Sequence, residues 1–81
     1  MKVSVKLFAV ARELAGRDEI EVELPEGSRV GQLRRELVAS CPRLAAILPQ
    51  MMIAMDGEYA PEDVIVRANA ELAAIPPVSG G

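Results

Sequence analysis

An α+β domain with one mixed sheet and one principal helix is predicted by three features of the 81-residue sequence. Two early segments, residues 3–7 and 19–24, alternate apolar and polar side chains, which is typical of strands with one buried face. Residues 30–40 space their apolar side chains three and four positions apart, which is typical of a helix. Several short apolar segments follow. This order of elements predicts a single sheet with the helix packed across one face.

The first strand is predicted to end beside a short helical turn. The alternation that buries Val5 and Leu7 places Phe8 on the wetter face. Residues 9–15 are rich in helix formers and stop at Gly16, which readily adopts the left-handed conformation that ends a helix. Phe8 therefore has two candidate roles, as a contact for a partner protein or as a satellite core residue covered by the turn.

The second strand and the principal helix follow in order. Residues 19–24 alternate glutamates with Ile, Val and Leu, so we expect a solvated acidic face and antiparallel pairing with the first strand. The helix is predicted over residues 30–40, because Pro42 lies just beyond its end. Arg34 and Arg35 are expected on its solvated face.

The last part of the chain supplies the remaining strands. Residues 51–55 form an uninterrupted apolar run before Asp56 and Gly57, which predicts a buried strand that enters a tight turn, with most of its methionines in the core. Residues 71–75 form the last strand. Residues 44–48 are too short for the second full-length helix that a ferredoxin-like βαββαβ layout needs, so the β-grasp arrangement is predicted.

Composition excludes several classes of chemistry. The absence of His and the single Cys, Cys41, exclude Ser-His-Asp and Cys-His catalysis, His-bearing zinc sites and an internal disulfide. We interpret Cys41 as a buried apolar residue in preference to a persulfide relay, and we expect no metal site. Lysines stand where a signal sequence has its apolar run, and no segment approaches the length of a transmembrane helix, so we expect a cytoplasmic protein with no membrane contact. A net charge of −3 and few aromatic residues argue against nucleic acid as a ligand.

The last six residues, 76–81, are predicted to form an extended tail on a domain of residues 1–75. The tail opens with two prolines, which lack the N–H groups that a sheet needs and hold the backbone extended. Gly80 and Gly81 have no side chains, so they fit a slot as narrow as a backbone. Adenylation with ATP would make the α-carboxylate of Gly81 reactive. A sulfur nucleophile would then leave a thiocarboxylate, and a lysine amine would leave an isopeptide.

The ending IPPVSGG, residues 75–81, resembles the C-terminus of the small, ubiquitin-like sulfur-carrier subunits of molybdopterin synthase. The resemblance covers nearly the whole chain, because residues 5–9 and 12–16 match that family's first strand and turn, and residues 54–59 match its third strand and turn. Members of the family often have Asp-Gly-Asp-Glu before the last strand. This chain has Ala-Asn-Ala-Glu there, and we expect Asn69 to take the left-handed conformation in place of Gly.

The resemblance implies a β-grasp sulfur carrier of molybdenum cofactor biosynthesis, which binds no cofactor itself and belongs to a heterotetrameric synthase. It implies that an adenylyltransferase related to ubiquitin-activating enzymes uses ATP to adenylate Gly81, and that a sulfur donor protein converts the adenylate to a thiocarboxylate. The large subunit of molybdopterin synthase would supply the catalytic side chains. Sulfur would pass there to cyclic pyranopterin monophosphate and build the molybdopterin dithiolene. The resemblance implies that Pro76, Pro77, Val78, Ser79 and Gly80 bind the partner, and strand alternation adds Phe8 as a candidate partner contact.

The residues alone leave three alternatives open. The first is a related sulfur carrier for thiamine thiazole, tRNA thiolation or cysteine synthesis. The second is a ubiquitin-like protein modifier that ends in an isopeptide bond. The third is a plain interaction domain with an inert tail, since chain termini are commonly disordered.

Overall fold

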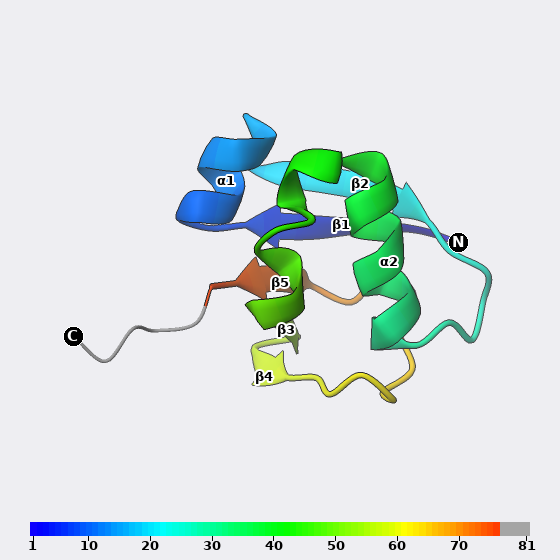
Figure 1. Ribbon diagram of the computed structural model, residues 1–81. Coiled ribbons are helices and arrows are strands. Elements are labelled where there is room, and N and C mark those ends of the chain that lie inside the picture. Colours follow the sequence, from blue (N-terminus) through cyan, green and yellow to red (C-terminus); the bar gives the residue numbers. More distant parts are fainter. Residues whose placement is uncertain (77–81) are drawn as a thin grey trace.

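The computed structural model describes residues 1–76, and residues 77–81 lie outside the described range. Its elements follow one another in the predicted order, two strands, then the main helix, then further strands (Figure 1). The strands are β1 (Lys2–Leu7), β2 (Glu19–Glu23), β3 (Met52–Met55), β4 (Glu58–Tyr59) and β5 (Leu72–Ile75). The helices are α1 (Val10–Ala15) and α2 (Val30–Ser40), and two 3-10 turns occupy Pro42–Leu44 and Leu48–Gln50. In this described part, neither helix is long enough to cross a membrane.

The sheet has the strand order β2-β1-β5-β3-β4. β1 and β5 lie parallel to each other at its centre, whereas the pairs β1–β2, β3–β5 and β3–β4 are antiparallel. α2 connects the first two strands to the rest of the sheet. α1 has only 6 residues, so the second full-length helix of a ferredoxin-like layout is not among the described elements. The predicted β-grasp arrangement, a mixed sheet with one principal helix, is confirmed.

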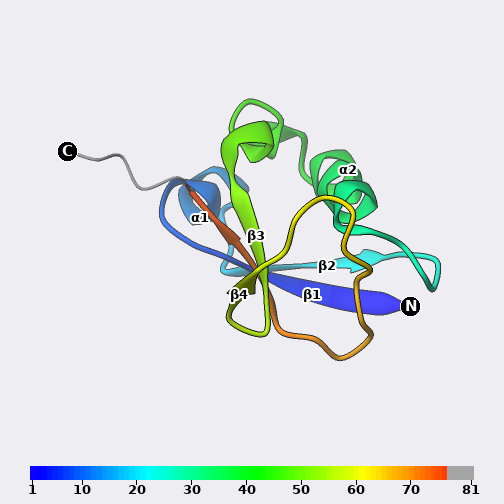
Figure 2. The same ribbon diagram turned by 90° about the horizontal axis from the view of Figure 1, so that it is seen from below.

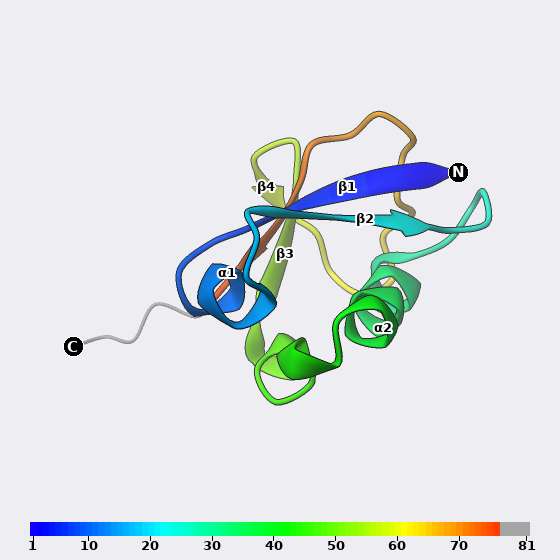
Figure 3. The ribbon, with the colours of Figure 1, turned by 90° about the horizontal axis from the view of Figure 1, so that it is seen from above.

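The core lies between α2 and one face of the sheet. Figures 2 and 3 show both helices and the 3-10 turns on the same side of β1 and β2. Six residues of this layer have no solvent exposure, namely Val5, Ile53 and Ala74 from the strands and Val30, Leu33 and Leu37 from α2. Full burial of a Val or Leu side chain stabilises a fold by about 1.5–3 kcal/mol, so this layer supplies much of the stability of a domain this small.

Two positions that the sequence assigns to left-handed backbone have that conformation. Gly16 ends α1 with φ 72°, and Asn69 precedes β5 with φ 67°. Asn adopts this region more readily than other residues that carry a side chain. The loop before β5 therefore obtains its left-handed residue without a glycine.

β2 forms a free edge of the sheet. The N–H of Leu7 donates to the carbonyl of Asp18 at 2.8 Å. The backbone groups of Asp18, and of every second residue after it, therefore face β1. Backbone groups alternate in direction along a strand. The N–H and C=O groups of Glu19, Glu21 and Glu23 therefore point away from β1, and the side chains of the same residues are exposed.

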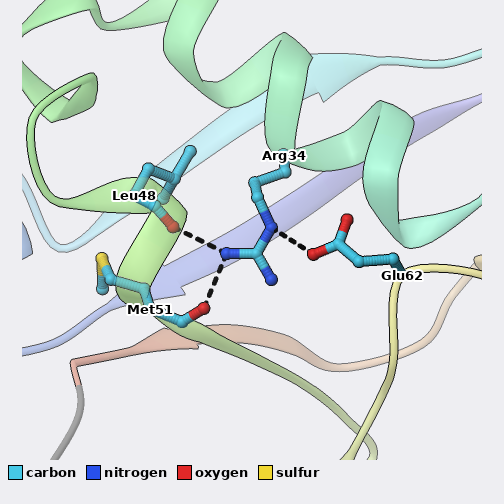
Figure 4. Close-up of polar contacts among 4 residues, drawn as sticks. All are labelled: Arg34, Leu48, Met51 and Glu62. Atoms are coloured by element: carbon cyan, nitrogen blue, oxygen red, sulfur yellow. Dashed lines mark hydrogen bonds and ion pairs between the residues drawn. The ribbon is translucent and has the colours of Figure 1, made fainter.

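Arg34 does not lie in solvent, so the prediction for this residue was wrong. Its side chain is 16% exposed, and its guanidinium contacts Glu62 and the backbone carbonyls of Leu48 and Met51 (Figure 4). Helical spacing predicts only which way a side chain points from its own helix. It does not show that two later segments fold back against that side of α2. Arg35 is exposed, as predicted.

Candidate functional site

The face of the sheet opposite α2, here called the open face, carries the candidate site. Side chains alternate between the two faces along a strand. In β5, Leu72 and Ala74 are buried under α2, so Ala73 and Ile75 point to the open face. Pro76, the first residue of the predicted tail, follows Ile75 directly and is half-buried. The open face therefore reaches the base of the tail.

Apolar side chains from neighbouring strands meet on the open face. Met52 pairs with Ile75 between β3 and β5, and Ala54 pairs with Ala73 on one side and with Tyr59 on the other. Met52 is 43% exposed and Tyr59 is 64% exposed. With Phe8 at the end of β1, these residues form the open-face patch, defined as Phe8, Met52, Ala54, Tyr59, Ala73 and Ile75. Exposed apolar patches that adjoin polar surface mark interaction sites.

A hollow of about 280 Å³ lies in this patch, beside the base of the tail. Its lining includes Phe8, Ala54, Ala73 and Ile75, with Lys6 and Glu71 as the charged groups. Lys6 reaches this position because it pairs with Ala73 in the parallel register of β1 and β5. The hollow suits an apolar side chain of a docking protein, with one cation and one anion available to fix its orientation.

The chain turns directly after Phe8, which continues the exposed side of β1. The N–H of Ala11 donates to the carbonyl of Phe8 at 3.1 Å, and Ala9 between them has φ 52° and ψ −126°. A positive φ costs a non-glycine residue about 1–3 kcal/mol, and such strain often lies beside functional sites. Phe8 is 46% exposed, so α1 does not cover it as a satellite core residue. Its role as a partner contact stays a prediction.

Two of the three methionines in residues 51–55 lie in or against the core, as predicted for most of them. Met51, just before the strand, is buried, and Met55 packs partly against the core. Met52 is on the open face, because β3 alternates like the other strands. The sequence does not reveal this alternation, because residues 51–55 are apolar at every position. Sequence reasoning predicted most of these methionines in the core without saying which one would be exposed, and it assigned no face to Tyr59 or Ile75.

Most of the predicted tail lies outside the described residues. This applies to Pro77, Val78, Ser79, Gly80 and the predicted reactive residue Gly81. β5 ends at Ile75, and Pro76 belongs to no strand, which agrees with the position where the prolines are expected to stop the sheet. Cys41 packs against the core as a small apolar residue, but it is half-buried and not fully buried as predicted.

Asp56 ties the turn between β3 and β4 to the start of β5. Its Oδ1 accepts a hydrogen bond from the backbone N–H of Glu71 at 2.9 Å, and its Oδ2 pairs with the guanidinium of Arg67. First the N–H of Glu71 and then Arg67 hold the pKa of Asp56 below its usual 3.8. These contacts keep the hairpin that carries Tyr59 against β5.

Comparison with known proteins places the chain among sulfur carriers and their structural relatives. Residues 5–81 match the model of the ThiS family. The molybdopterin synthase sulfur carrier subunit of Arabidopsis thaliana is 38% identical over 81 residues, which cover 100% of this chain and 84% of that relative. The crystal structure of SAMP1, a small archaeal modifier protein from Haloferax volcanii, has a TM-score of 0.88 and 30% identity over 100% of both chains. The complex of subunits 1 and 2 of molybdopterin-converting factor from Helicobacter pylori has a TM-score of 0.70 over 100% of both chains, and its 18% identity shows the fold alone.

Proposed function

The chain belongs to the ThiS family, and from this premise we propose that it is the sulfur-carrier subunit of a molybdopterin synthase. The full-length identity with the Arabidopsis thaliana sulfur carrier subunit supports this specific role. The reactive group in this proposal is the α-carboxylate of Gly81. The protein acts as a cosubstrate, and the catalytic side chains belong to its partners.

The chemistry at Gly81 has three steps. First, a carboxylate oxygen attacks the α-phosphate of ATP, which yields the acyl adenylate and pyrophosphate. Second, a sulfur nucleophile at the sulfide oxidation level attacks the acyl carbon, the bond to the AMP oxygen breaks, and AMP leaves a thiocarboxylate behind. Third, the thiocarboxylate sulfur displaces an oxygen of cyclic pyranopterin monophosphate, and water then cleaves the resulting thioester, which leaves the sulfur on the pterin and restores the carboxylate of Gly81. The dithiolene has two sulfur atoms, so two thiocarboxylated carriers are consumed for each molecule formed.

These steps require three partner proteins. An adenylyltransferase related to ubiquitin-activating enzymes binds ATP and Gly81, a sulfur donor protein supplies the second step, and the large synthase subunit provides the site of the third. Each partner receives the same tail, so each must hold the body of the carrier while Gly81 enters its active site. Gly80 and residues 76–79 would pass through a narrow channel.

The observation that carries the proposal is the continuity between the open-face patch and the tail. Met52 and Ile75 pair at the end of the sheet where Pro76 begins. A partner that covers the patch with a standard apolar contact therefore holds the base of the tail at the same time. Phe8, beside the hollow, is the aromatic anchor of this contact, because buried aromatic residues dominate many interfaces.

Intact-mass measurement tests the proposal. The carrier is incubated with its cognate adenylyltransferase, ATP and a sulfide source. We expect a mass gain equal to the difference between a sulfur and an oxygen atom, and no gain without ATP. A variant that lacks Gly81 is the matched control. Dithiolene formation after addition of the large subunit and cyclic pyranopterin monophosphate separates this role from thiazole, tRNA or cysteine pathways. An unchanged mass with a competent activating enzyme contradicts the proposal.

A second candidate function, protein modification, is favoured by one observation. SAMP1, whose name describes a modifier, has nearly the same fold at 30% identity. In that role, a lysine amine of a target attacks the Gly81 adenylate, AMP leaves, and an isopeptide forms. Immunoblots of cells that express a tagged carrier distinguish the two roles. A ladder of conjugates that requires Gly81 supports modification, and a single free band supports sulfur transfer alone.

A further inference from the structure

Arg34 connects α2 to two segments that are distant in the sequence. Its Nε lies 2.6 Å from Oε1 of Glu62, and its Nη1 donates to the carbonyls of Leu48 and Met51, each at 2.6 Å (Figure 4). The planar guanidinium matches this set of acceptors, because its N–H groups point in fixed directions. The close-up shows the guanidinium between the 3-10 turn and the loop that carries Glu62.

The two connected segments depend on Arg34 to different degrees. The loop with Glu62 has other contacts with the start of α2, since Gly31 N–H donates to the Glu62 carbonyl at 3.0 Å and Arg29 donates to the Asp63 carbonyl at 2.6 Å. Residues 48–51 have no such second polar contact with α2 among residues 1–76. Their other backbone bonds are local, as in the donation from Met51 N–H to the Leu48 carbonyl at 3.1 Å. Arg34 therefore supplies the polar connection from α2 to the segment just before β3.

That segment leads directly to the base of the tail. Met51, whose carbonyl accepts from Arg34, is followed by Met52, and Met52 pairs with Ile75 across β3 and β5. Pro76 comes next along the chain. The path from the guanidinium to the tail thus consists of one hydrogen bond, one strand pairing and two peptide links.

We propose that Arg34 is a positioning residue for the tail. This role rests on the proposed function. Arg34 lies on the covered side of the sheet and fixes the segment before β3. It thereby sets the position of Pro76 relative to the open-face patch. A partner must hold the patch and the tail together, so a displaced tail base weakens the delivery of Gly81. Arg34 does not touch the partner or the reacting atoms.

The test compares Arg34→Gln with two matched controls. Arg35→Gln removes the same charge from the next, exposed position of α2, and Val22→Ala weakens the core in β2, a strand that does not adjoin β5. The adenylation kcat/KM is measured with the cognate adenylyltransferase and ATP. We expect Arg34→Gln to lower it about tenfold, since the three charge-assisted hydrogen bonds of the guanidinium are lost. Each control should stay within about twofold of the wild type.

Amide hydrogen exchange supplies a readout that general destabilisation does not reproduce. In Arg34→Gln, the amide of Ile75 should exchange faster while the amide of Val5, in the centre of the sheet, keeps its protection. Val22→Ala should change exchange at β1 and β2 first. Arg34→Lys keeps the charge but cannot span the carboxylate and both carbonyls, so it should show an intermediate loss and serves if the Gln variant does not fold.

The outcomes separate the two proposals. If the wild-type carrier is not adenylated at all, the proposed function fails, and the role of Arg34 in it fails as well. If the wild type is adenylated and Arg34→Gln matches Arg35→Gln in kcat/KM, or loses activity without faster exchange at the amide of Ile75, the positioning role is overturned while the proposed function stands.

Discussion

The two faces of one sheet differ sharply in exposure although their residues alternate along the same strands. On the face under α2, Ile53 and Ala74 have no solvent exposure. On the open face, their immediate neighbour Met52 is 43% exposed and Ile75 is half-buried. A domain this small needs one face for its core, and it leaves the other uncovered, with apolar side chains over β3, β4 and β5 and polar ones over β1 and β2. This division lets contacts with partners vary separately from stability, and the following changes test how complete the separation is.

The largest effect is expected on the covered face. Leu37 has no exposure and packs in the layer between α2 and the sheet. Leu37→Ala should lower the free energy of unfolding by about 2–5 kcal/mol, because it removes buried methyl groups and leaves a cavity. Urea denaturation monitored by circular dichroism measures this change. A loss below about 1 kcal/mol would show that the α2 layer is not the main core.

A change on the open face should alter the affinity for a partner more than the free energy of unfolding. Phe8→Ala should lower the free energy of unfolding by less than about 1 kcal/mol, since the side chain is 46% exposed. We expect it to weaken binding to the cognate large synthase subunit by about 2 kcal/mol, as loss of an aromatic anchor does. Isothermal titration calorimetry gives the affinity, and the control is Lys2→Ala, at the far end of β1 from Phe8. Equal affinities for wild type and Phe8→Ala would remove Phe8 from the interface.

The smallest effect concerns the hairpin at the border of the open face, and it depends on pH. The folded-state pKa of Asp56 is below 3.8, so the folded protein holds this proton less tightly than the unfolded chain. The stabilisation is therefore fully present above the unfolded pKa and is lost as the pH falls through the folded pKa. Asp56→Asn should melt at a lower temperature than wild type at pH 7, and the difference should shrink as the pH falls below 3.8. A constant difference in melting temperature across this range would contradict the assignment.

Local patterns were sufficient for the elements, and tertiary contacts account for what they missed. The bounds of α2 agree with the prediction for residues 30–40, because helical spacing and Pro42 act locally. The left-handed Asn69 also follows from the properties of one residue. Arg34 was assigned wrongly, and Met52 was not singled out as the exposed methionine, since their surroundings are set by the 48–51 segment and by β5. The positive φ of Ala9 has no sequence signal, because Ala rarely adopts it.

The position of β2 at the edge of the sheet bears on self-association of the protein. An edge strand has unpaired backbone N–H and C=O groups, which can pair with the edge strand of a second copy and cause aggregation. Here the outward backbone groups belong to Glu19, Glu21 and Glu23, so a second copy that approached edge to edge would bring two rows of negative charge into contact. Repulsion between these rows opposes edge-to-edge pairing of two copies through β2.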